Sequence, residues 1–491
     1  MRGVVAAGHP LTADAGADVL RAGGNAVDAA LAAMLTSFVT EPLLTGLGAG
    51  GYMLVAAPGR DDVLLDFFVA APGQGADEAA RAPLAPVEVS FGDAVQAFNV
   101  GAASCGAYGT PAGVCAAAER FGTVPLAELA APAVALARDG VEVNAQQAYL
   151  FEILAPITEH TPEARALFMA GGRPLRPGEI HRDPGLGDAL ERLAAEGPAP
   201  FYTGEVADAV VQWIAERGGT ITHEDLAAYA AVPREPVRVA YRGREVLTNP
   251  PPSAGGTLLA YALALLERSA PPPSPGDLVA AMERTQEERT PAFLEGLSAP
   301  AFLERFMASR LGSTTHISVL DADGWACAAT CTNGEGSGVV VPGTGVHLNN
   351  MMGEQDLSPL GFFMHPPGRR LPSMMAPTVV LAADGAPEIV LGSAGSNRIR
   401  SALLQVIVNV LDGGMDAAAA VEAPRLHYED GIVYTEPGID TEALEAGGRT
   451  LARFRERNLF FGGCQAVERD PRTGALSGGG DPRRGGEVVV A

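Results

Sequence analysis

Cysteine is scarce in this chain of 491 residues. Its five cysteines, an odd number, exclude the kind of disulfide framework on which small secreted proteins depend. Cys327 and Cys331 are separated by three residues, but no second pair and no nearby histidine completes the ligand set of a zinc ion. We therefore expect no metal site and reduced thiols at all five positions (Cys105, Cys115, Cys327, Cys331 and Cys464).

Long hydrophobic runs are also missing. No stretch of about 18 apolar residues runs without a break, and the start, MRGVVAAGHPLTADAG, lacks the apolar segment and cleavage site of a signal peptide. Basic residues number 34 against 58 acidic residues, which gives a formal net charge of -24. This charge disfavours nucleic acid and anionic membranes as partners. We expect a soluble, cytoplasmic protein.

Apolar residues make up 47% of the chain, enough for a large core. Their periodicity predicts helices at 12–21, 26–38, 114–121, 126–139, 187–195, 205–217, 224–229 and 257–266, and strands at 237–246, 315–320, 325–332, 378–382 and 389–392. The two kinds of element follow no regular βαβ rhythm, which favours stacked sheets covered by helices over a Rossmann or barrel fold. Because neither a repeat nor a linker is evident, we expect one intertwined domain over residues 1–491.

Three glycines, Gly46, Gly48 and Gly51, match the GxGxxG pattern of dinucleotide-binding loops. Such a loop leads from a strand into a helix. Here the predicted order is a helix, then the glycines, then a strand. The pattern therefore predicts no dinucleotide and no other cofactor, and we attribute the glycines to close packing of a helix on a sheet.

A threonine directly precedes a predicted buried strand in the segment GSTTHISV, residues 312–319. If the chain is cut between Ser313 and Thr314, Thr314 becomes an N-terminal residue that carries a hydroxyl nucleophile and its own α-amine as base. The neighbouring His316 is not needed for this chemistry, and we expect it to form hydrogen bonds inside the sheet.

The strand after Thr314 continues through Asp321–Gly324 into a second apolar strand, and Asp-Gly between two such runs predicts a hairpin. If Asp323 and Gly324 are the central turn residues, Thr314 pairs with Asn333 and Thr315 with Thr332. A hydroxyl and an amide then lie beside Thr314. Threonines are also common in strands, so spacing alone leaves a purely structural role open.

Many segments resemble, in order, those of the γ-glutamyltransferase (γ-glutamyltranspeptidase) family of N-terminal nucleophile hydrolases. They include AGGNAVDAALAA, GTPAGV, FYTGEVADAV, NPPPSAGGTLLA, TTHISVLDADG, GVHLNNMMGEQD, LGSAGSNRI and a final DPR at 481–483. Each segment alone is weak evidence for the family, but the whole set in this order is specific to it and spans nearly the whole chain. The resemblance implies a mixed α/β (α+β) fold, a four-layer αββα sandwich.

The resemblance also implies self-cleavage, because the family precursor cuts itself before the threonine of its TTH motif. In this chain the cut falls between Ser313 and Thr314 and gives a large chain, 1–313, and a small chain, 314–491. The two chains are expected to stay associated, with a higher oligomer left open. Thr314 then attacks a substrate amide and forms an acyl-enzyme, which water or an amine releases.

Three further catalytic residues follow from the resemblance. Thr332 corresponds to the family threonine that holds the N-terminal amine in place. The backbone N–H groups of Gly395 and Ser396 correspond to the oxyanion hole, where one donor contributes about 3–4 kcal/mol. The family usually has two glycines here, so Ser396 fits only if its backbone conformation does not require glycine.

The substrate-binding positions depart from the family. Phe68 stands where the family usually has an arginine for the substrate α-carboxylate, and phenylalanine cannot form that ion pair. Met351 and Glu354 stand where the family binds the α-amino group. Ser373 and Met374 replace a pair of serines.

These departures leave the substrate open. Asn333 either corresponds to the family asparagine or is offset from it. Arg369, Arg370 or Arg398 could replace the missing arginine, and Phe68 could simply be a packing residue. The alternatives are a γ-glutamyltransferase acting on compounds such as glutathione, an acylase for non-glutamyl amides, and an uncleaved, inactive binding protein.

Overall fold

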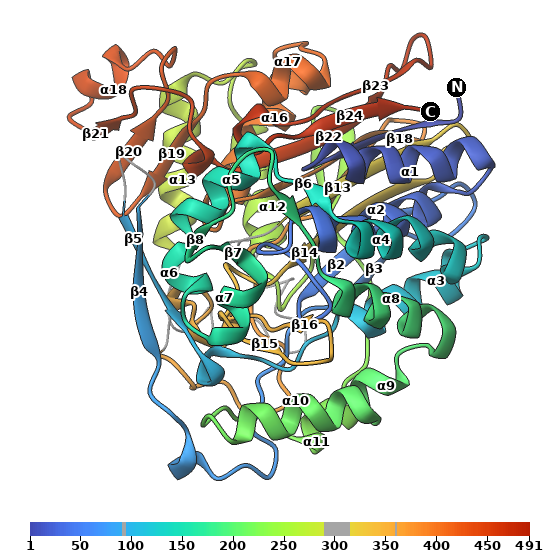
Figure 1. Ribbon diagram of the computed structural model, residues 1–491. Coiled ribbons are helices and arrows are strands. Elements are labelled where there is room, and N and C mark those ends of the chain that lie inside the picture. Colours follow the sequence, from blue (N-terminus) through green and yellow to red (C-terminus); the bar gives the residue numbers. More distant parts are fainter. Residues whose placement is uncertain (91–94, 289–314, 359–360) are drawn as a thin grey trace.

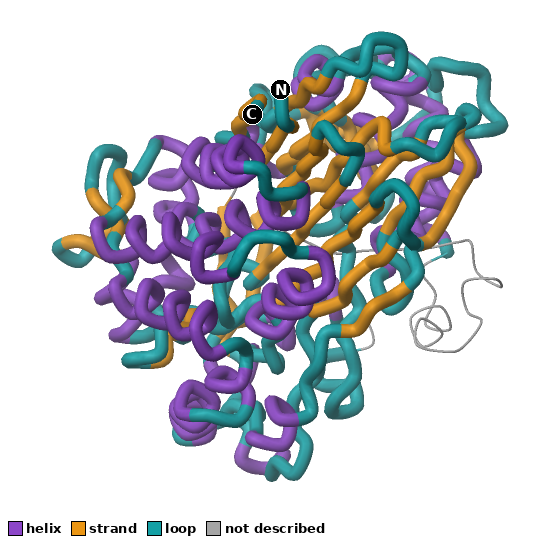
Figure 2. Tube along the Cα trace, turned by 90° about the vertical axis from the view of Figure 1, so that its right-hand side faces the viewer, coloured by secondary structure: helices purple, strands orange, loops and turns teal. Residues whose placement is uncertain are grey.

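Two stacked sheets form the centre of the molecule (Figures 1 and 2). The computed structural model describes residues 1–90, 95–288, 315–358 and 361–491. The first sheet has seven strands, in the order β10 (Val232–Arg234), β3 (Val63–Phe67), β2 (Gly50–Ala56), β14 (Ala326–Thr332), β13 (Thr315–Asp321), β1 (Gly3–Ala7) and β24 (Glu487–Val490). The second has six, in the order β11 (Val237–Tyr241), β12 (Arg244–Thr248), β17 (Thr378–Leu381), β18 (Pro387–Ala394), β22 (Gly463–Arg469) and β23 (Leu476–Gly479).

Helices cover the outer face of each sheet. Five pack over the first sheet: α1 (Pro10–Ala22), α2 (Ala26–Thr40), α3 (Thr110–Phe121), α4 (Leu126–Asp139) and α8 (Pro184–Glu196). Four pack over the second: α12 (Ala254–Leu266), α13 (Pro275–Glu287), α16 (Arg398–Leu411) and α17 (Ala417–Glu422). Figure 2 shows the strands running through the middle with helices on either side.

The remaining elements are shorter and lie around this sandwich. The helices among them are α5 (Ala145–Ile153), α6 (Ala155–Thr158), α7 (Pro162–Phe168), α9 (Ala199–Tyr202), α10 (Glu205–Ala215), α11 (His223–Ala227) and α18 (Glu442–Ala446). The strands are β4 (Ala85–Ser90), β5 (Val95–Val100), β6 (Val141–Glu142), β7 (Met169–Ala170), β8 (Arg173–Pro174), β9 (Ile180–His181), β15 (Val340–Val341), β16 (Val346–His347), β19 (Leu426–Glu429), β20 (Ile432–Thr435) and β21 (Thr450–Arg453).

Alternation along β13 shows how the sequence builds the layers. Ile317 and Val319 belong to the apolar cluster under the helices of the first sheet, whereas Leu320 belongs to the cluster between the sheets. A third cluster fills the space between the second sheet and its helices. Since successive side chains of a strand point to opposite faces, one strand contributes to two apolar layers. The four-layer αββα sandwich is confirmed.

Local signals placed several helix ends correctly. The α4 helix has the predicted bounds, and Asn25 caps α2 in a capping box with Asp28. Gly23 ends α1 in the left-handed region, with φ of 100°. The helix predicted at 12–21 begins two residues earlier, because Pro10 occupies its first turn and His9 is the N-cap.

Two turns were missed or misplaced. The predicted strand 237–246 is a hairpin of β11 and β12, with Arg242 and Gly243 at φ of 50° and 73°. The turn after β13 has three residues, because Asp321 N–H donates to the Trp325 carbonyl at 3.0 Å and Gly324 has a φ of 87°. Thr315 therefore pairs with Cys331, one residue from the predicted register.

The GxGxxG glycines allow close backbone approach rather than helix packing, which corrects the expectation. A Cβ atom on Gly48 would lie 2.2 Å from the His347 carbonyl oxygen, and one on Gly51 would lie 2.2 Å from that of Thr330. Thr330 belongs to β14, the neighbour of β2 in the first sheet, and His347 to β16 outside that sheet, so these glycines let neighbouring backbone come close.

All five cysteines have free thiols. Among the described residues, no His, Cys, Asp or Glu side chains form a group of three or more that could hold a metal ion. Within the same residues, no helix is long and apolar enough to cross a membrane.

Candidate active site

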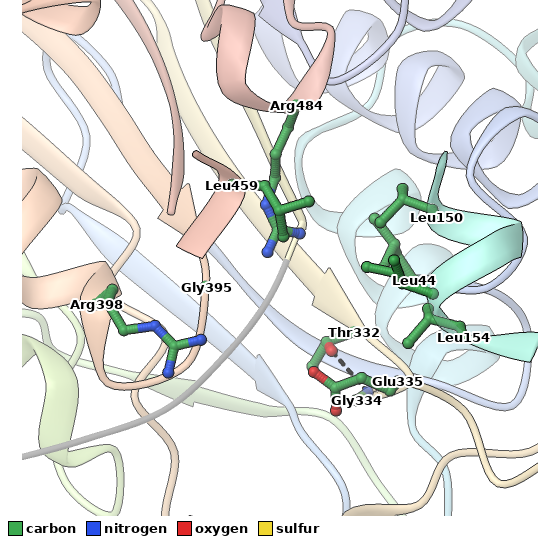
Figure 3. Close-up of a pocket in the computed structure, with 11 residues that line it drawn as sticks. Leu44, Leu150, Leu154, Thr332, Gly334, Glu335, Gly395, Arg398, Leu459 and Arg484 are labelled. Atoms are coloured by element: carbon green, nitrogen blue, oxygen red, sulfur yellow. Dashed lines mark hydrogen bonds between the residues drawn. The ribbon is translucent and has the colours of Figure 1, made fainter. Parts of the chain in front are cut away.

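A small cavity, with a volume of about 30 Å³, lies where β14 and β18 end (Figure 3). Thr332 is the last residue of β14, and Gly395 directly follows β18. The polar lining of the cavity also includes Gly334, Glu335, Arg398 and Arg484. The apolar lining consists of Leu44, Leu150, Ile153, Leu154 and Leu459. The structure thus brings two predicted catalytic residues, Thr332 and Gly395, into one cavity. Ser313 and Thr314 lie outside the described residues.

Thr332 and the residue after it are buried. The Thr332 hydroxyl accepts a hydrogen bond from the Gly334 N–H at 2.7 Å. The Asn333 N–H donates to the Leu44 carbonyl at 2.8 Å. In the part of the chain described, neither polar atom of the Asn333 side chain has a hydrogen-bond partner, although the residue is fully buried. An orphaned buried amide costs about 1–3 kcal/mol and is typical of a site that a ligand completes.

The turn after β18 presents backbone N–H groups at the start of α16. The Gly395 carbonyl accepts from Arg398 N–H at 3.0 Å, which tightens the turn. A Cβ atom at Gly395 would lie 2.6 Å from Gly462 Cα, and its φ of 121° also favours glycine. Ser396 has a φ of 54°, so its conformation is one that glycine adopts more easily. A helix N-terminus stabilises negative charge.

Replacing Ser396 by glycine is expected to raise the free energy of unfolding by about 0.5–1 kcal/mol, because the left-handed region costs a non-glycine residue roughly 1–2 kcal/mol. Turnover should change less than about twofold, since the backbone N–H is retained. Urea denaturation and initial rates measure the two effects. Gly395→Ala is the matched control and should destabilise the protein, because its Cβ meets Gly462. A less stable Ser396→Gly variant would show that the serine side chain contributes more than its backbone costs.

The three predicted apolar binding residues lie in the core. Phe68 and Met351 are 1% exposed and belong to the cluster between the sheets. The Phe68 ring stacks on Tyr52 with centroids 5.5 Å apart. Met374 is fully buried between the second sheet and its helices. This placement matches the packing alternative for Phe68, and none of the three is among the residues that line the cavity.

Glu354 and Ser373, two of the three predicted polar binding residues, lie in different places. Glu354 is buried beside the loop after Thr332, since a Cβ atom on Gly334 would lie 2.1 Å from Glu354 Oε1. Ser373 lies beside the first turn of α12, and its carbonyl accepts a hydrogen bond from the Ala254 N–H at 2.7 Å. Its hydroxyl accepts from the Met375 N–H at 3.0 Å.

Of the three arginines considered as a replacement for the missing clamp, Arg398 lines the cavity. Its Nε donates to the Phe460 carbonyl at 2.9 Å, and its guanidinium lies 4.7 Å from the centre of the Phe460 ring. Arg370 is paired instead with Asp66, at 3.3 Å. Figure 3 shows Arg398 on one side of the cavity and three of the leucines on the other.

Sequence reasoning missed two charged residues at this end of the sheet, Glu41 and Arg484. Thr315 Oγ1 donates to Glu41 Oε1 at 3.2 Å. Burial raises the pKa of Glu41 to about 7, while the Thr315 hydrogen bond and the Arg484 charge oppose this rise. Burial lowers the pKa of Arg484, and the nearby Arg398 charge lowers it further. An acidic residue directly after a largely apolar helix was the available signal for Glu41.

His316 forms hydrogen bonds inside the sandwich, as expected. Its Nδ1 and Nε2 lie 2.8 Å and 2.9 Å from the hydroxyls of Thr330 and Ser318. Burial lowers its pKa to about 3, so the imidazole is neutral. A Cβ atom at Gly392 would lie 2.2 Å from the ring, so this glycine makes room for it between the sheets.

A four-layer sandwich with a threonine-lined cavity at the strand ends is the architecture of N-terminal nucleophile hydrolases. The family description "Gamma-glutamyltranspeptidase" matches residues 12–293 and 283–491. The chain belongs to the γ-glutamyltranspeptidase family.

Relatives within the family carry two kinds of name. The "Acylase ACY 1 proenzyme" of Pseudomonas sp. (strain SE83) is 32% identical over 100% of this chain and 93% of its own length. The "Glutathione hydrolase proenzyme" of Escherichia coli (strain K12) is 33% identical over 98% and 90%. The crystal structure of cephalosporin acylase from Bacillus halodurans superposes with a TM-score of 0.85 at 29% identity, covering 99% of this chain and 95% of that one.

Proposed function

We propose that this protein is a self-processing amide hydrolase and acyltransferase whose nucleophile is Thr314. The observation that carries the proposal is the meeting of Thr332 and Gly395 in one cavity, at the end of the sheet where β13 begins. Thr315 is the first residue of β13, and position 314 is joined to it by one peptide bond, so their Cα atoms are about 3.8 Å apart. Thr332 directly follows Cys331, the partner of Thr315.

In the proposed mechanism, cleavage between Ser313 and Thr314 frees the Thr314 α-amine. The amine takes the hydroxyl proton, and the oxygen attacks the carbonyl carbon of the substrate amide. The N–H groups of Gly395 and Ser396 donate to the oxygen that becomes negative, and Thr332 holds the amine. The amine then protonates the leaving nitrogen. Water or an acceptor amine releases the acyl group from Thr314.

The fold supports a processed enzyme that stays in one piece. Segments 1–313 and 314–491 each contribute strands to both sheets. In the first sheet, β1 lies between β13 and β24, so a strand of the large chain pairs with two strands of the small chain. We propose one intertwined domain that survives the cut as two associated chains.

Two classes of acyl donor are candidates for the substrate. A γ-glutamyl donor such as glutathione is the first candidate, with Arg398 in the cavity lining as the group for its carboxylate. A non-glutamyl acyl group is the second, favoured by the leucine side of the cavity and by the burial of Phe68 in the core. The names of the relatives, acylase and glutathione hydrolase, support both candidates.

Two measurements test the proposal. Mass spectrometry under denaturing conditions should find chains of 313 and 178 residues, and a single uncut chain would leave only the inactive binding protein. Release of p-nitroaniline from γ-glutamyl, glutaryl and hexanoyl anilides then separates the donors. Preference for the γ-glutamyl compound supports the first candidate, and preference for either of the others supports the second.

A further inference from the structure

The turn between β18 and α16 has a backbone that its surroundings must hold in place. Gly395 and Ser396 both have positive φ, of 121° and 54°, and the second value is unfavourable for a residue other than glycine. A strained conformation of this kind persists only where the surrounding structure over-determines it. The next residue, Asn397, is the N-cap of α16 and is 4% exposed. The contacts of Asn397 therefore bear on the two N–H groups that precede it.

The Asn397 side chain departs from the usual behaviour of an asparagine at an N-cap. Such a side chain normally accepts a hydrogen bond from an N–H of the first helical turn. Along the described residues of α16, Asn397 forms no such bond. Its Nδ2 donates instead to Glu429 Oε1, at the end of β19 and 32 residues along the chain. Asn397 thus ties the turn to another element rather than to its own helix.

A second pair of side chains joins the same helix and strand. Ser401 lies four residues after Asn397, on the same face of α16, and His427 lies two residues before Glu429, on the same face of β19. His427 Nδ1 lies 2.8 Å from Ser401 Oγ, and His427 Nε2 lies 3.2 Å from Glu429 Oε2. The four side chains therefore form one continuous hydrogen-bonded path behind the turn.

Protonation states fix the direction of each bond on this path. Burial alone would raise the pKa of Glu429, but the His427 hydrogen bond and the charges of Arg398 and Arg400 hold it at about 2. Burial lowers the pKa of His427, against the opposing effect of Glu429. Since an ionised carboxylate only accepts, neutral His427 donates from Nε2, and its Nδ1 accepts from the Ser401 hydroxyl. Each bond then has one donor and one acceptor.

Aromatic rings hold the imidazole as well. His427 is fully buried, its ring stacks on Tyr434 with centroids 6.1 Å apart, and it lies edge to face with Phe460 at 6.3 Å. Phe460 also lies under the Arg398 guanidinium and accepts from Arg398 Nε through its carbonyl. The path therefore packs beside Arg398, which lines the cavity together with Gly395.

Resting on the function proposed above, we propose that Glu429 and His427 are positioning residues, which act through Asn397 to aim the N–H groups of the Gly395–Ser396 turn at the developing oxyanion. Ser401 fixes His427, His427 orients the Glu429 carboxylate, and the carboxylate holds Asn397. Oxyanion donors are effective because they are in place before the charge develops. A displaced turn therefore lowers kcat and changes substrate binding little.

An exchange of donor and acceptor tests this path. Asn397→Asp places a second carboxylate against Glu429, and the repulsion should displace the turn. Glu429→Gln offers one oxygen to two donors, so its NH₂ group must face either Asn397 or His427. In the double variant the glutamine oxygen accepts from His427, while its NH₂ group donates to the new carboxylate. Both hydrogen bonds are then restored, with donor and acceptor exchanged between positions 397 and 429.

The measurement is p-nitroaniline release from whichever of the three anilides named above the wild type turns over fastest. Rates are divided by the fraction of cleaved chain, which mass spectrometry gives. Asn397→Asp should lower kcat about 10–100-fold and change KM less than about threefold, as for a misplacement of about 1 Å. Glu429→Gln should lose less, and the double variant should be faster than either single variant.

Glu388→Gln is the matched control. Glu388 is a buried carboxylate of β18, at the end of the strand farther from Gly395, and it accepts from Arg244 Nε at 3.0 Å. Its replacement removes an ion pair from the strand that leads into the turn. We expect a lower unfolding midpoint and an unchanged kcat, which separates loss of stability from displacement of the turn.

A wild-type kcat in Asn397→Asp, or a double variant no faster than Asn397→Asp, would overturn the proposal. A lower unfolding midpoint with an unchanged kcat would also overturn it, because a merely structural cluster gives that result. If Asn397→Asp does not fold or stays uncut, a double variant faster than Glu429→Gln supports the proposal, and one that is not faster overturns it. A wild-type chain that turns over no anilide would instead overturn the proposed function, so the two failures are distinct.

Discussion

A Thr314→Ala variant is expected to remain one chain of 491 residues and to release no product from any amide. Alanine has no hydroxyl, so neither the attack on the Ser313 carbonyl nor the attack on a substrate can occur. Loss of a nucleophile commonly lowers kcat by about 10⁶-fold, which puts any residual rate below detection. Intact mass and anilide turnover measure the two losses on one sample.

The composition of the chain gives this test a second readout. The sequence contains no lysine, so the α-amine of Met1 is the only primary amine that an uncut chain starting at Met1 carries. Cleavage adds one more, on Thr314, and an amine-reactive label should count one site in Thr314→Ala and two in the wild type. Thr314→Ser keeps a hydroxyl and is the matched control, expected to cleave. A Thr314→Ala chain that still cuts itself would show that another residue is the nucleophile.

Asp481→Asn is expected to lower the free energy of unfolding by about 3–5 kcal/mol, the typical cost of breaking a buried ion pair. Asp481 is fully buried, with Oδ2 2.7 Å from Arg425 Nη2 and Oδ1 3.2 Å from Arg483 Nη1. Asparagine keeps the shape but removes the charge, which leaves two buried guanidinium groups with the single carboxylate of Glu436. Urea denaturation measures the loss.

The pH dependence of this effect follows from the charge. Burial alone would raise the pKa of Asp481, but the Arg425 and Arg483 charges and backbone donors hold it below its usual value. A group with a lowered pKa stabilises the fold above its unfolded-state pKa and loses this effect as the pH falls through the folded-state value. The advantage of the wild type over Asp481→Asn should therefore be constant near neutrality and shrink in acid.

Asp188→Asn is the surface control, because Asp188 pairs with Arg138 while 73% of its side chain is exposed. It should cost less than about 1 kcal/mol. An equally small effect of Asp481→Asn would mean that the buried cluster tolerates the loss of one carboxylate.

Local sequence patterns predicted much of the fold, but not the exact register of the β13–β14 hairpin. The alternation in β13 and the Asp-Gly turn predicted the hairpin that ends at Thr332. The error of one residue came from Asp321, whose side chain accepts from the N–H groups of Asp323 and Trp325. These bonds favour a three-residue turn with Gly324 in the left-handed region, a choice that the letters DADG do not reveal.

Some residues of the candidate site could likewise be predicted from the sequence, and others could not. Thr332 was predicted from the hairpin and the family resemblance, and Gly395 from the resemblance; the structure places both in the lining of one cavity. The substrate residues were harder, because whether Phe68 faces a ligand or a core depends on Tyr52, a partner in another strand. Glu41 was missed because the residues it contacts, Thr315 and Gly8, lie far from it in the sequence.

The pairing of β1 with both β13 and β24 has a consequence for refolding. In the uncut chain all three strands belong to one molecule, so folding is a first-order process that does not depend on concentration. Once residues 313 and 314 are separated, the same sheet must form from two molecules, and its assembly becomes second order. Dilution then slows recovery of the processed protein but not of its precursor. After the cut, refolding of the mature protein would be slow at low concentration. Its stability would then depend on slow unfolding, whereas the precursor can refold.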